Sequence, residues 1–164
     1  HIGVTEAGTP ERGKIKSAAG IGALLLEGIG DTMRVSLTAD PVKEVVFAKE
    51  LLASLGIRKD DIEIVSCPTC GRTEVDLEKI AESIEARTEE PRKKGVSGIR
   101  IAVMGCVVNG PGEARDSDIG VACGRGKGVI FSKGEIISTV EEEDIAEEII
   151  RLAGEYDRNT GRFD

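Results

Sequence analysis

The first third of the chain alternates short apolar runs with helical patterns, and this alternation constrains its fold more than any other feature. Apolar runs predict strands at 2–5 and 33–37, and the spacing of apolar residues predicts helices at 15–26 and 42–55. Asp40-Pro41 supports the start of the second helix, because Asp caps a helix and Pro suits its first turn, and Gly56 is a suitable stop. Strand, helix, strand and helix in this order predict two βα units of a parallel sheet, which cannot close a barrel alone.

A second α/β domain is expected beyond the charged residues at 58–61. Its predicted strands lie at 62–65, 99–104, 119–122, 128–131 and 136–140, and its predicted helices at 75–87 and 141–152. The charge run at 89–95 is predicted to be an exposed loop, and the polar end at 155–164 is predicted to be frayed. The expected organisation is therefore one domain over residues 1–57 and another over residues 58–164.

Charge and hydropathy exclude several classes of protein. The net charge of -8 argues against a general nucleic-acid or anionic-membrane binder, which needs an excess of Lys and Arg to neutralise phosphates. No apolar run is long enough to span a bilayer, and His1-Ile2-Gly3-Val4 does not have the regions of a signal peptide, so we expect a cytoplasmic protein. The same residues begin directly as a strand without an initiator Met, which predicts a piece of a longer protein.

Three of the four cysteines follow predicted strands within a few residues. Cys67-Pro68-Thr69-Cys70 stands where the strand at 62–65 ends, and Cys106 follows the strand at 99–104. If these strands are neighbours, their ends bring the thiols together. Thiolates are the usual ligands of iron-sulfur clusters, and a CxxC pair with a further cysteine from a distant loop is a typical supply. The pattern therefore favours a cluster that is completed by one more ligand.

Spacing alone leaves other interpretations of the cysteines open. A structural zinc site needs a second ligand pair at short spacing, and Cys106 and Cys123 are too far apart to form it. A thioredoxin-type dithiol fits Cys67 and Cys70 locally but leaves Cys106 unexplained. Cys123 is expected in a glycine-rich turn without a partner at short spacing, and it is interpreted as a small buried apolar residue. A zinc-stabilised binding module and a dithiol oxidoreductase fragment therefore stand as alternative hypotheses.

Longer motifs add a family resemblance. The segments at 3–8, 20–37, 67–72 and 104–114 together resemble the 4-hydroxy-3-methylbut-2-enyl diphosphate synthases. The resemblance implies the last two βα units of a TIM barrel, followed by a small α/β iron-sulfur domain of the sulfite-reductase-like kind. It also implies a 4Fe-4S cluster, which in that family is bound by three cysteines and one glutamate. These ligands fall here on Cys67, Cys70, Cys106 and Glu113.

The same resemblance assigns roles around the substrate. A carboxylate ligand from Glu113 would leave one iron open to exchange, and Glu6 would do acid or base work beside the substrate. Substrate contacts are expected from Thr5, Arg34, Ser36 and Asn109. The guanidinium of Arg34 and the hydroxyl of Ser36 lie two residues apart on a predicted strand and suit a diphosphate.

The activity that the resemblance implies is a reductive ring opening and dehydroxylation. Its substrate would be 2-C-methyl-D-erythritol 2,4-cyclodiphosphate, and its product 4-hydroxy-3-methylbut-2-enyl diphosphate of the non-mevalonate isoprenoid pathway. Ferredoxin or flavodoxin is the implied electron donor, and the complete enzyme is expected to be a homodimer. The chain by itself is expected to bind a cluster but not to turn over.

Overall fold

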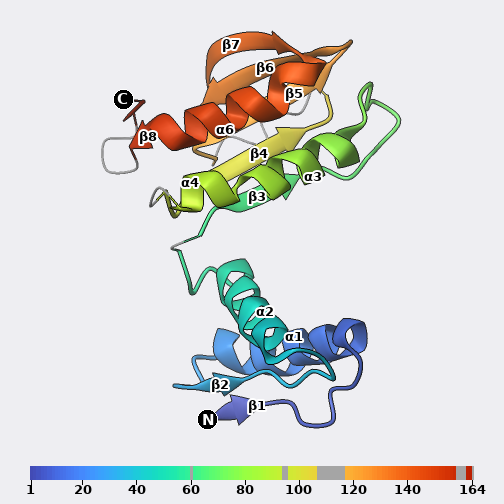
Figure 1. Cartoon of the computed structure of the whole chain (residues 1–164), viewed down its shortest axis with the longest axis vertical. Coiled ribbons are helices and arrows are strands. Elements are labelled where there is room, and N and C mark those ends of the chain that lie inside the picture. Colours follow the sequence, from blue (N-terminus) through green and yellow to red (C-terminus); the bar gives the residue numbers. More distant parts are fainter. Residues whose placement is uncertain (60, 94–95, 107–116, 158–161, 164) are drawn as a thin grey trace. The chain divides into compact units, whose positions relative to one another are not determined.

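The computed structural model describes residues 1–59, 61–93, 96–106, 117–157 and 162–163 (Figure 1). The chain divides into two units, His1–Lys59 and Asp60–Asp164. The charged segment at 58–61 spans this division. No helix within the described ranges is long and apolar enough to cross a membrane.

The first unit consists of two strands and two helices in alternation. They are β1 (Ile2–Gly3), α1 (Pro10–Leu26), β2 (Met33–Arg34) and α2 (Pro41–Ser54). β1 and β2 pair in parallel, with Ile2 opposite Met33 and Gly3 opposite Arg34. The predicted order of two βα units is therefore confirmed. The paired strands are shorter than the runs predicted at 2–5 and 33–37, and each has a single partner in the described part of this unit.

Local signals in the sequence set both ends of α2. The Asp40 carboxylate accepts a hydrogen bond from the Val42 N–H (2.8 Å), and Pro41 takes the first helical position. Beyond the helix, Gly56 adopts a φ of +68° and its N–H donates to the Ala53 carbonyl (2.9 Å). The predicted start and stop are confirmed, and a cap of the Asp40 kind contributes about 1 kcal/mol to stability.

The core of the first unit covers only part of its helices. Its buried members are Ile21, Val35, Leu37, Phe47 and Leu51. Apolar side chains on the same helices stay more than half exposed, namely Ile15 (66%), Leu26 (69%), Val42 (67%) and Val45 (55%). The described residues of this unit therefore do not cover all of the apolar surface of α1 and α2.

The second unit is built on a five-stranded sheet with the order β3-β4-β5-β6-β7. Its strands are β3 (Glu63–Ser66), β4 (Arg100–Met104), β5 (Ile119–Gly124), β6 (Lys127–Ser132) and β7 (Glu135–Glu141). Its helices are α3 (Leu77–Arg87), α4 (Glu89–Lys93), the short 3-10 helix η1 (Glu142–Asp144) and α6 (Ile145–Glu155). β3, β4 and β5 run parallel, whereas β6 pairs antiparallel with both β5 and β7.

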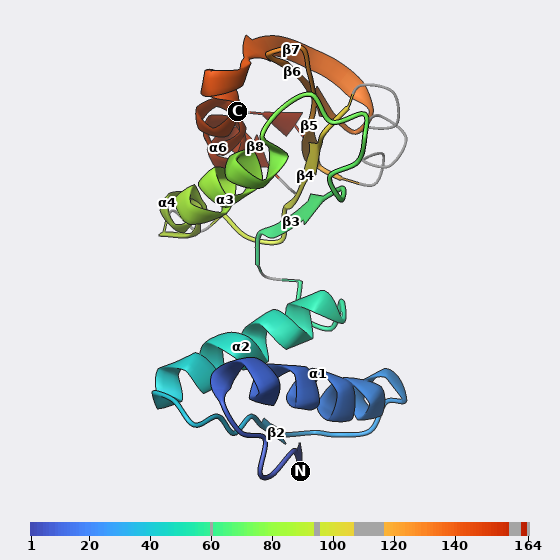
Figure 2. The same ribbon diagram turned by 90° about the vertical axis from the view of Figure 1, so that its right-hand side faces the viewer.

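The two faces of this sheet have different cores. On β4, Ile101 and Val103 belong to the large cluster that includes Ile84 of α3 and Ile149 of α6. Both helices lie on the same side of the sheet (Figure 2). The alternate residues Ala102 and Met104 belong to a smaller cluster with Ala122 and Phe131. Each fully buried aliphatic side chain of this kind contributes roughly 1.5–3 kcal/mol, so the α3 and α6 face carries most of the stability of the unit.

Two predictions about exposed segments are wrong. Residues 89–93 of the predicted loop form α4, in which the Lys93 ammonium lies 3.2 Å from the Glu90 carboxylate and Pro91 is buried. The predicted frayed end is also ordered in part, because β8 (Tyr156–Asp157) pairs with β9 (Arg162–Phe163). Tyr156 is only 6% exposed, and its hydroxyl donates to the Asp118 carboxylate (2.9 Å). In both places burial against the sheet domain overrides a polar local sequence.

A close approach inside the sheet generates the first prediction. Gly120 of β5 is paired with Phe131 of β6, and a Cβ on Gly120 would overlap the Phe131 ring. Gly120→Ala is expected to lower the free energy of unfolding by about 1–3 kcal/mol, measured by urea unfolding followed by circular dichroism. The control is Gly154→Ala in α6, where a Cβ would meet nothing within 4 Å. Gly154→Ala should leave the free energy of unfolding unchanged or raise it by up to about 1 kcal/mol. Equal stability of the two variants would contradict the packing argument.

Candidate metal centre

The ends of two neighbouring strands bring the cysteine-bearing segments together. β3 and β4 are parallel, with Ser66 opposite Val103, so the residues after both strands leave the sheet at the same edge. Cys67 donates its N–H to the Val103 carbonyl (3.4 Å), and its sulfur accepts the N–H of Gly105 (3.3 Å). Cys67 is therefore in hydrogen-bond contact with the residue that directly precedes Cys106.

Cys70 lies in a turn that favours its thiolate form. The Thr73 N–H donates to the Cys70 carbonyl (3.0 Å), and the Cys70 N–H donates to the Thr73 hydroxyl (3.2 Å). The pKa of the Cys70 thiol is lowered, chiefly by a hydrogen bond from the Arg72 backbone N–H and further by the Thr73 hydroxyl and the charge of Arg72. An exposed thiol with a lowered pKa is suited to reaction or to metal binding.

Cys123 has the opposite environment. It is fully buried in β5, rather than in a glycine-rich turn, and burial raises its pKa to about 12. Negative charge at Glu142 and Cys67 acts in the same direction. The prediction that Cys123 is a small buried apolar residue is confirmed, because a thiol held neutral in the core is a poor ligand.

The donor atoms fit a thiolate-bound metal centre in kind. Cys67, Cys70 and Cys106 are free thiols, and the first and last are half-buried. Among the described residues, however, no group of three or more His, Cys, Asp and Glu side chains stands close enough to hold a metal ion. The predicted residues Glu113 and Asn109 lie outside the described residues. The structure thus brings the cysteine-bearing segments to one edge of the sheet, but the described side chains do not form a complete set of metal ligands.

Two residues outside the predicted site join these segments. A Cβ on Gly105 would lie 2.9 Å from the Thr73 hydroxyl oxygen and 3.0 Å from the Thr73 methyl carbon. The Thr73 side chain is therefore packed against the backbone just before Cys106. The sequence carries only a weak signal of this contact, a glycine placed directly before a cysteine, because the partner lies far away along the chain.

The predicted substrate residues of the first unit follow its two parallel strands. Thr5 and Glu6 come after β1 and are exposed, and Glu6 has a φ of 55°. Arg34 ends β2 and is exposed, whereas Ser36 is half-buried and alternates with buried Val35 and Leu37. The predicted placement of Arg34 and Ser36 on one face agrees with this alternation. Because β1 and β2 run parallel, the residues after both strands leave at the same edge.

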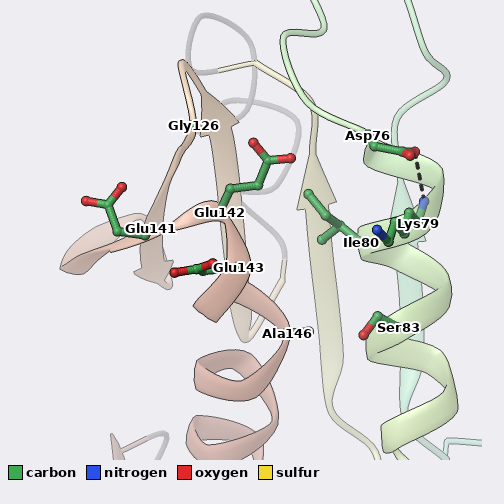
Figure 3. A pocket seen from close by; sticks show the side chains of 9 residues that line it. All are labelled: Asp76, Lys79, Ile80, Ser83, Gly126, Glu141, Glu142, Glu143 and Ala146. Atoms are coloured by element: carbon green, nitrogen blue, oxygen red, sulfur yellow. Dashed lines mark hydrogen bonds between the residues drawn. The ribbon is translucent and has the colours of Figure 1, made fainter.

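A separate pocket of about 580 Å³ lies between α3 and the η1–α6 segment (Figure 3). Its polar lining is mainly acidic, with Asp76, Glu141, Glu142 and Glu143 and one lysine, Lys79. The Asp76 carboxylate accepts a hydrogen bond from the Lys79 N–H (3.2 Å) as the cap of α3. No cysteine lines this pocket, so it is distinct from the candidate metal centre.

Comparison with protein families matches both units. The family model described as the GcpE TIM-barrel domain matches residues 1–49. The model described as the GcpE protein C-terminal domain matches residues 63–155, which is more than half of the chain.

Curated relatives match most of this chain but less than half of their own length. The chain is 61% identical to the 4-hydroxy-3-methylbut-2-en-1-yl diphosphate synthase (flavodoxin) of Clostridium perfringens, over 93% of this chain and 42% of that protein. It is 55% identical to the protein of the same name from Fusobacterium nucleatum, over 94% of this chain and 43% of that protein. The corresponding protein of Nitratidesulfovibrio vulgaris is 60% identical over 86% of this chain and 36% of its own length.

The contrast between Cys70 and Cys123 generates the second prediction. In the metal-free, reduced chain at pH 8, a thiol with a pKa of about 12 holds only on the order of one part in 10,000 as thiolate. Iodoacetamide is therefore expected to modify Cys70 rapidly and Cys123 only after unfolding, as followed by peptide mass spectrometry. The control is the same chain in urea, in which all cysteines should react at similar rates. Rapid alkylation of Cys123 in the folded chain would contradict the assigned environments.

Proposed function

Because the chain belongs to the GcpE family, we propose that it forms the C-terminal part of a 4-hydroxy-3-methylbut-2-en-1-yl diphosphate synthase. The proposed reaction opens the ring of 2-C-methyl-D-erythritol 2,4-cyclodiphosphate and yields 4-hydroxy-3-methylbut-2-enyl diphosphate in the non-mevalonate isoprenoid pathway. A carbon–oxygen bond to the ring phosphate breaks, one hydroxyl leaves as water, and two electrons and two protons enter. The observation that carries the proposal is the placement of the free cysteines Cys67, Cys70 and Cys106 in the segments that follow the parallel strands β3 and β4 at one edge of the sheet.

We assign the second unit to a 4Fe-4S cluster held by Cys67, Cys70, Cys106 and Glu113. When bound, the cluster would supply electrons and an iron with an exchangeable position for a substrate oxygen. The hydrogen bond from the Arg72 N–H lowers the pKa of the Cys70 thiol and so favours the thiolate, which is the form that binds metal. The Gly105 N–H gives Cys67 a fixed orientation (3.3 Å). Glu113 would contribute a carboxylate oxygen, a harder ligand that exchanges more readily than a thiolate.

We assign the first unit to the substrate. In this proposal Arg34 and Ser36 bind the diphosphate, because a guanidinium forms charge-assisted hydrogen bonds with phosphate oxygens and a hydroxyl adds a neutral one. Glu6 serves as acid or base, and Thr5 and Asn109 contact the substrate. The two parallel strands would be the last strands of a TIM barrel, whose active sites lie at the carboxyl ends of the strands. The exposed apolar side chains of α1 and α2 fit helices that have neighbours in a complete barrel.

Further parts of the proposal concern the complete enzyme. The chain spans about two fifths of the length of the relatives it matches, so most of the barrel would lie in residues beyond this sequence. The proposed electron donor is flavodoxin or ferredoxin, and the proposed assembly is a cytoplasmic homodimer. A sulfite-reductase-like architecture is proposed for the second unit. The chain alone is expected to bind the cluster without turning over substrate.

The third prediction tests the ligand set. Anaerobic reconstitution of the chain with iron and sulfide is expected to give about four irons per chain, together with visible absorbance. Cys70→Ser and Cys106→Ser should lose most of this iron, whereas the matched control Cys123→Ser should retain it. Iron would be measured by colorimetric assay and zinc by mass spectrometry. Stoichiometric zinc without iron uptake would favour a zinc-stabilised module, and uptake of neither metal would favour a dithiol site. Iron retained by Cys106→Ser would remove Cys106 from the ligand set.

The fourth prediction tests the division of labour between the units. In the complete enzyme, Arg34→Ala is expected to weaken binding of the cyclodiphosphate by roughly 1.5–3 kcal/mol, through loss of a charge-assisted phosphate contact. Binding would be measured by calorimetry. The spectrum of the substrate-free cluster should not change.

The control for Arg34 is Lys49→Ala, which removes an exposed positive charge from α2 of the same unit. It should leave substrate affinity unaltered. Loss of the cluster from Arg34→Ala with intact substrate affinity would refute the assignment of the substrate to the first unit.

A further inference from the structure

Thr73 closes the turn that carries Cys70. Its hydroxyl oxygen accepts the Cys70 N–H (3.2 Å), and its own N–H donates to the Cys70 carbonyl (3.0 Å). The same hydroxyl donates toward the Cys70 sulfur at 4.0 Å, a long contact of the kind that sulfur accepts. Thr73 is therefore a hydrogen-bond partner of both the backbone and the sulfur of Cys70.

The methyl group of Thr73 faces the other cysteine-bearing segment. A Cβ on Gly105 would lie 3.0 Å from this methyl carbon, closer than carbon atoms normally approach. Only a residue without a side chain fits at position 105 while Thr73 stays in place. Gly105 in turn donates its N–H to the Cys67 sulfur (3.3 Å) and precedes Cys106. Thr73 thus contacts the segments on which all the proposed cysteine ligands stand.

We propose that Thr73 is a positioning residue for the sulfur ligands, with separate tasks for its hydroxyl and its methyl group. The inference rests on the proposed function, in which these cysteines hold a cluster. The hydroxyl donates to the Cys70 sulfur, and the methyl group holds the Gly105 backbone so that its N–H reaches the Cys67 sulfur. Hydrogen bonds to ligand sulfurs withdraw negative charge and stabilise the reduced cluster, so they raise its reduction potential.

Two conservative variants separate these tasks. Thr73→Val keeps a branched side chain of similar size against Gly105 but removes the hydroxyl. Thr73→Ser keeps the hydroxyl but removes the methyl group that contacts Gly105. Thr69→Val is a matched control, because Thr69 is exposed in the same turn and its hydroxyl makes no hydrogen bond within the described residues.

The fifth prediction concerns the reduction potential of the cluster in the reconstituted 164-residue chain. Thr73→Val is expected to reduce the equilibrium constant for one-electron reduction about tenfold, which corresponds to a potential lower by about 59 mV. Thr73→Ser and Thr69→Val should keep the potential of the parent chain. Thr73→Ser should instead release iron faster to a chelator, since the Gly105 segment is held less firmly. The potential would be measured by anaerobic redox titration followed by electron paramagnetic resonance.

The outcomes separate this inference from the proposed function. Iron uptake by the parent chain with equal potentials in all variants would overturn the role of Thr73 while leaving the cluster assignment in place. Equal loss of iron from Thr73→Val and Thr73→Ser would also overturn it, because the hydroxyl would then have no task of its own. If Thr73→Val were the only variant that took up no iron, this would support the role of the hydroxyl as required for cluster binding. A parent chain that takes up no iron would remove the cluster assignment and this inference with it.

Discussion

The parallel pairing of β3 with β4 is the constraint on which the candidate metal centre depends. Parallel strands end at the same edge, so the segments after Ser66 and Met104 leave the sheet as neighbours although they are far apart in the sequence. A register shift of one residue would reverse which side chains of β4 face α3 and α6. Ile101 and Val103 are completely buried against those helices, so the hydrophobic core fixes the register and with it the contact between Cys67 and Gly105.

Glycines allow side chains to pack closely against the backbone in this chain, which has few aromatic residues. Aromatic residues make up only 2% of the chain, and aliphatic side chains must fill the space between helices and sheet. At Gly128 of β6, a Cβ would lie 2.7 Å from a methyl carbon of Val121 and 2.8 Å from Ile145 of α6. The glycine allows this helix to approach the sheet closely. Gly105 serves the same purpose at the edge of the sheet, where it admits Thr73.

Most of the fold could be predicted because its elements carry strong local signals. The strands and helices of both units occur in the predicted order, and the start of α2 at Asp40-Pro41 is fixed by residues next to each other in the sequence. The family resemblance is also confirmed, by matches over residues 1–49 and 63–155. The failures lie where tertiary burial outweighs a polar sequence, as for Pro91 in α4 and Tyr156 beside Asp118. Their partners are distant in the chain, so no local pattern could reveal them.

The sequence by itself determined the types and the order of the predicted elements, and the presence of three cysteines that follow two strands within a few residues. These properties follow from periodicity and from residues a few positions apart. Only the tertiary structure decided that β3 and β4 are neighbours and that Thr73 lies against Gly105. Strand order and close packing depend on which surfaces exclude water together, and that is a property of the folded chain as a whole.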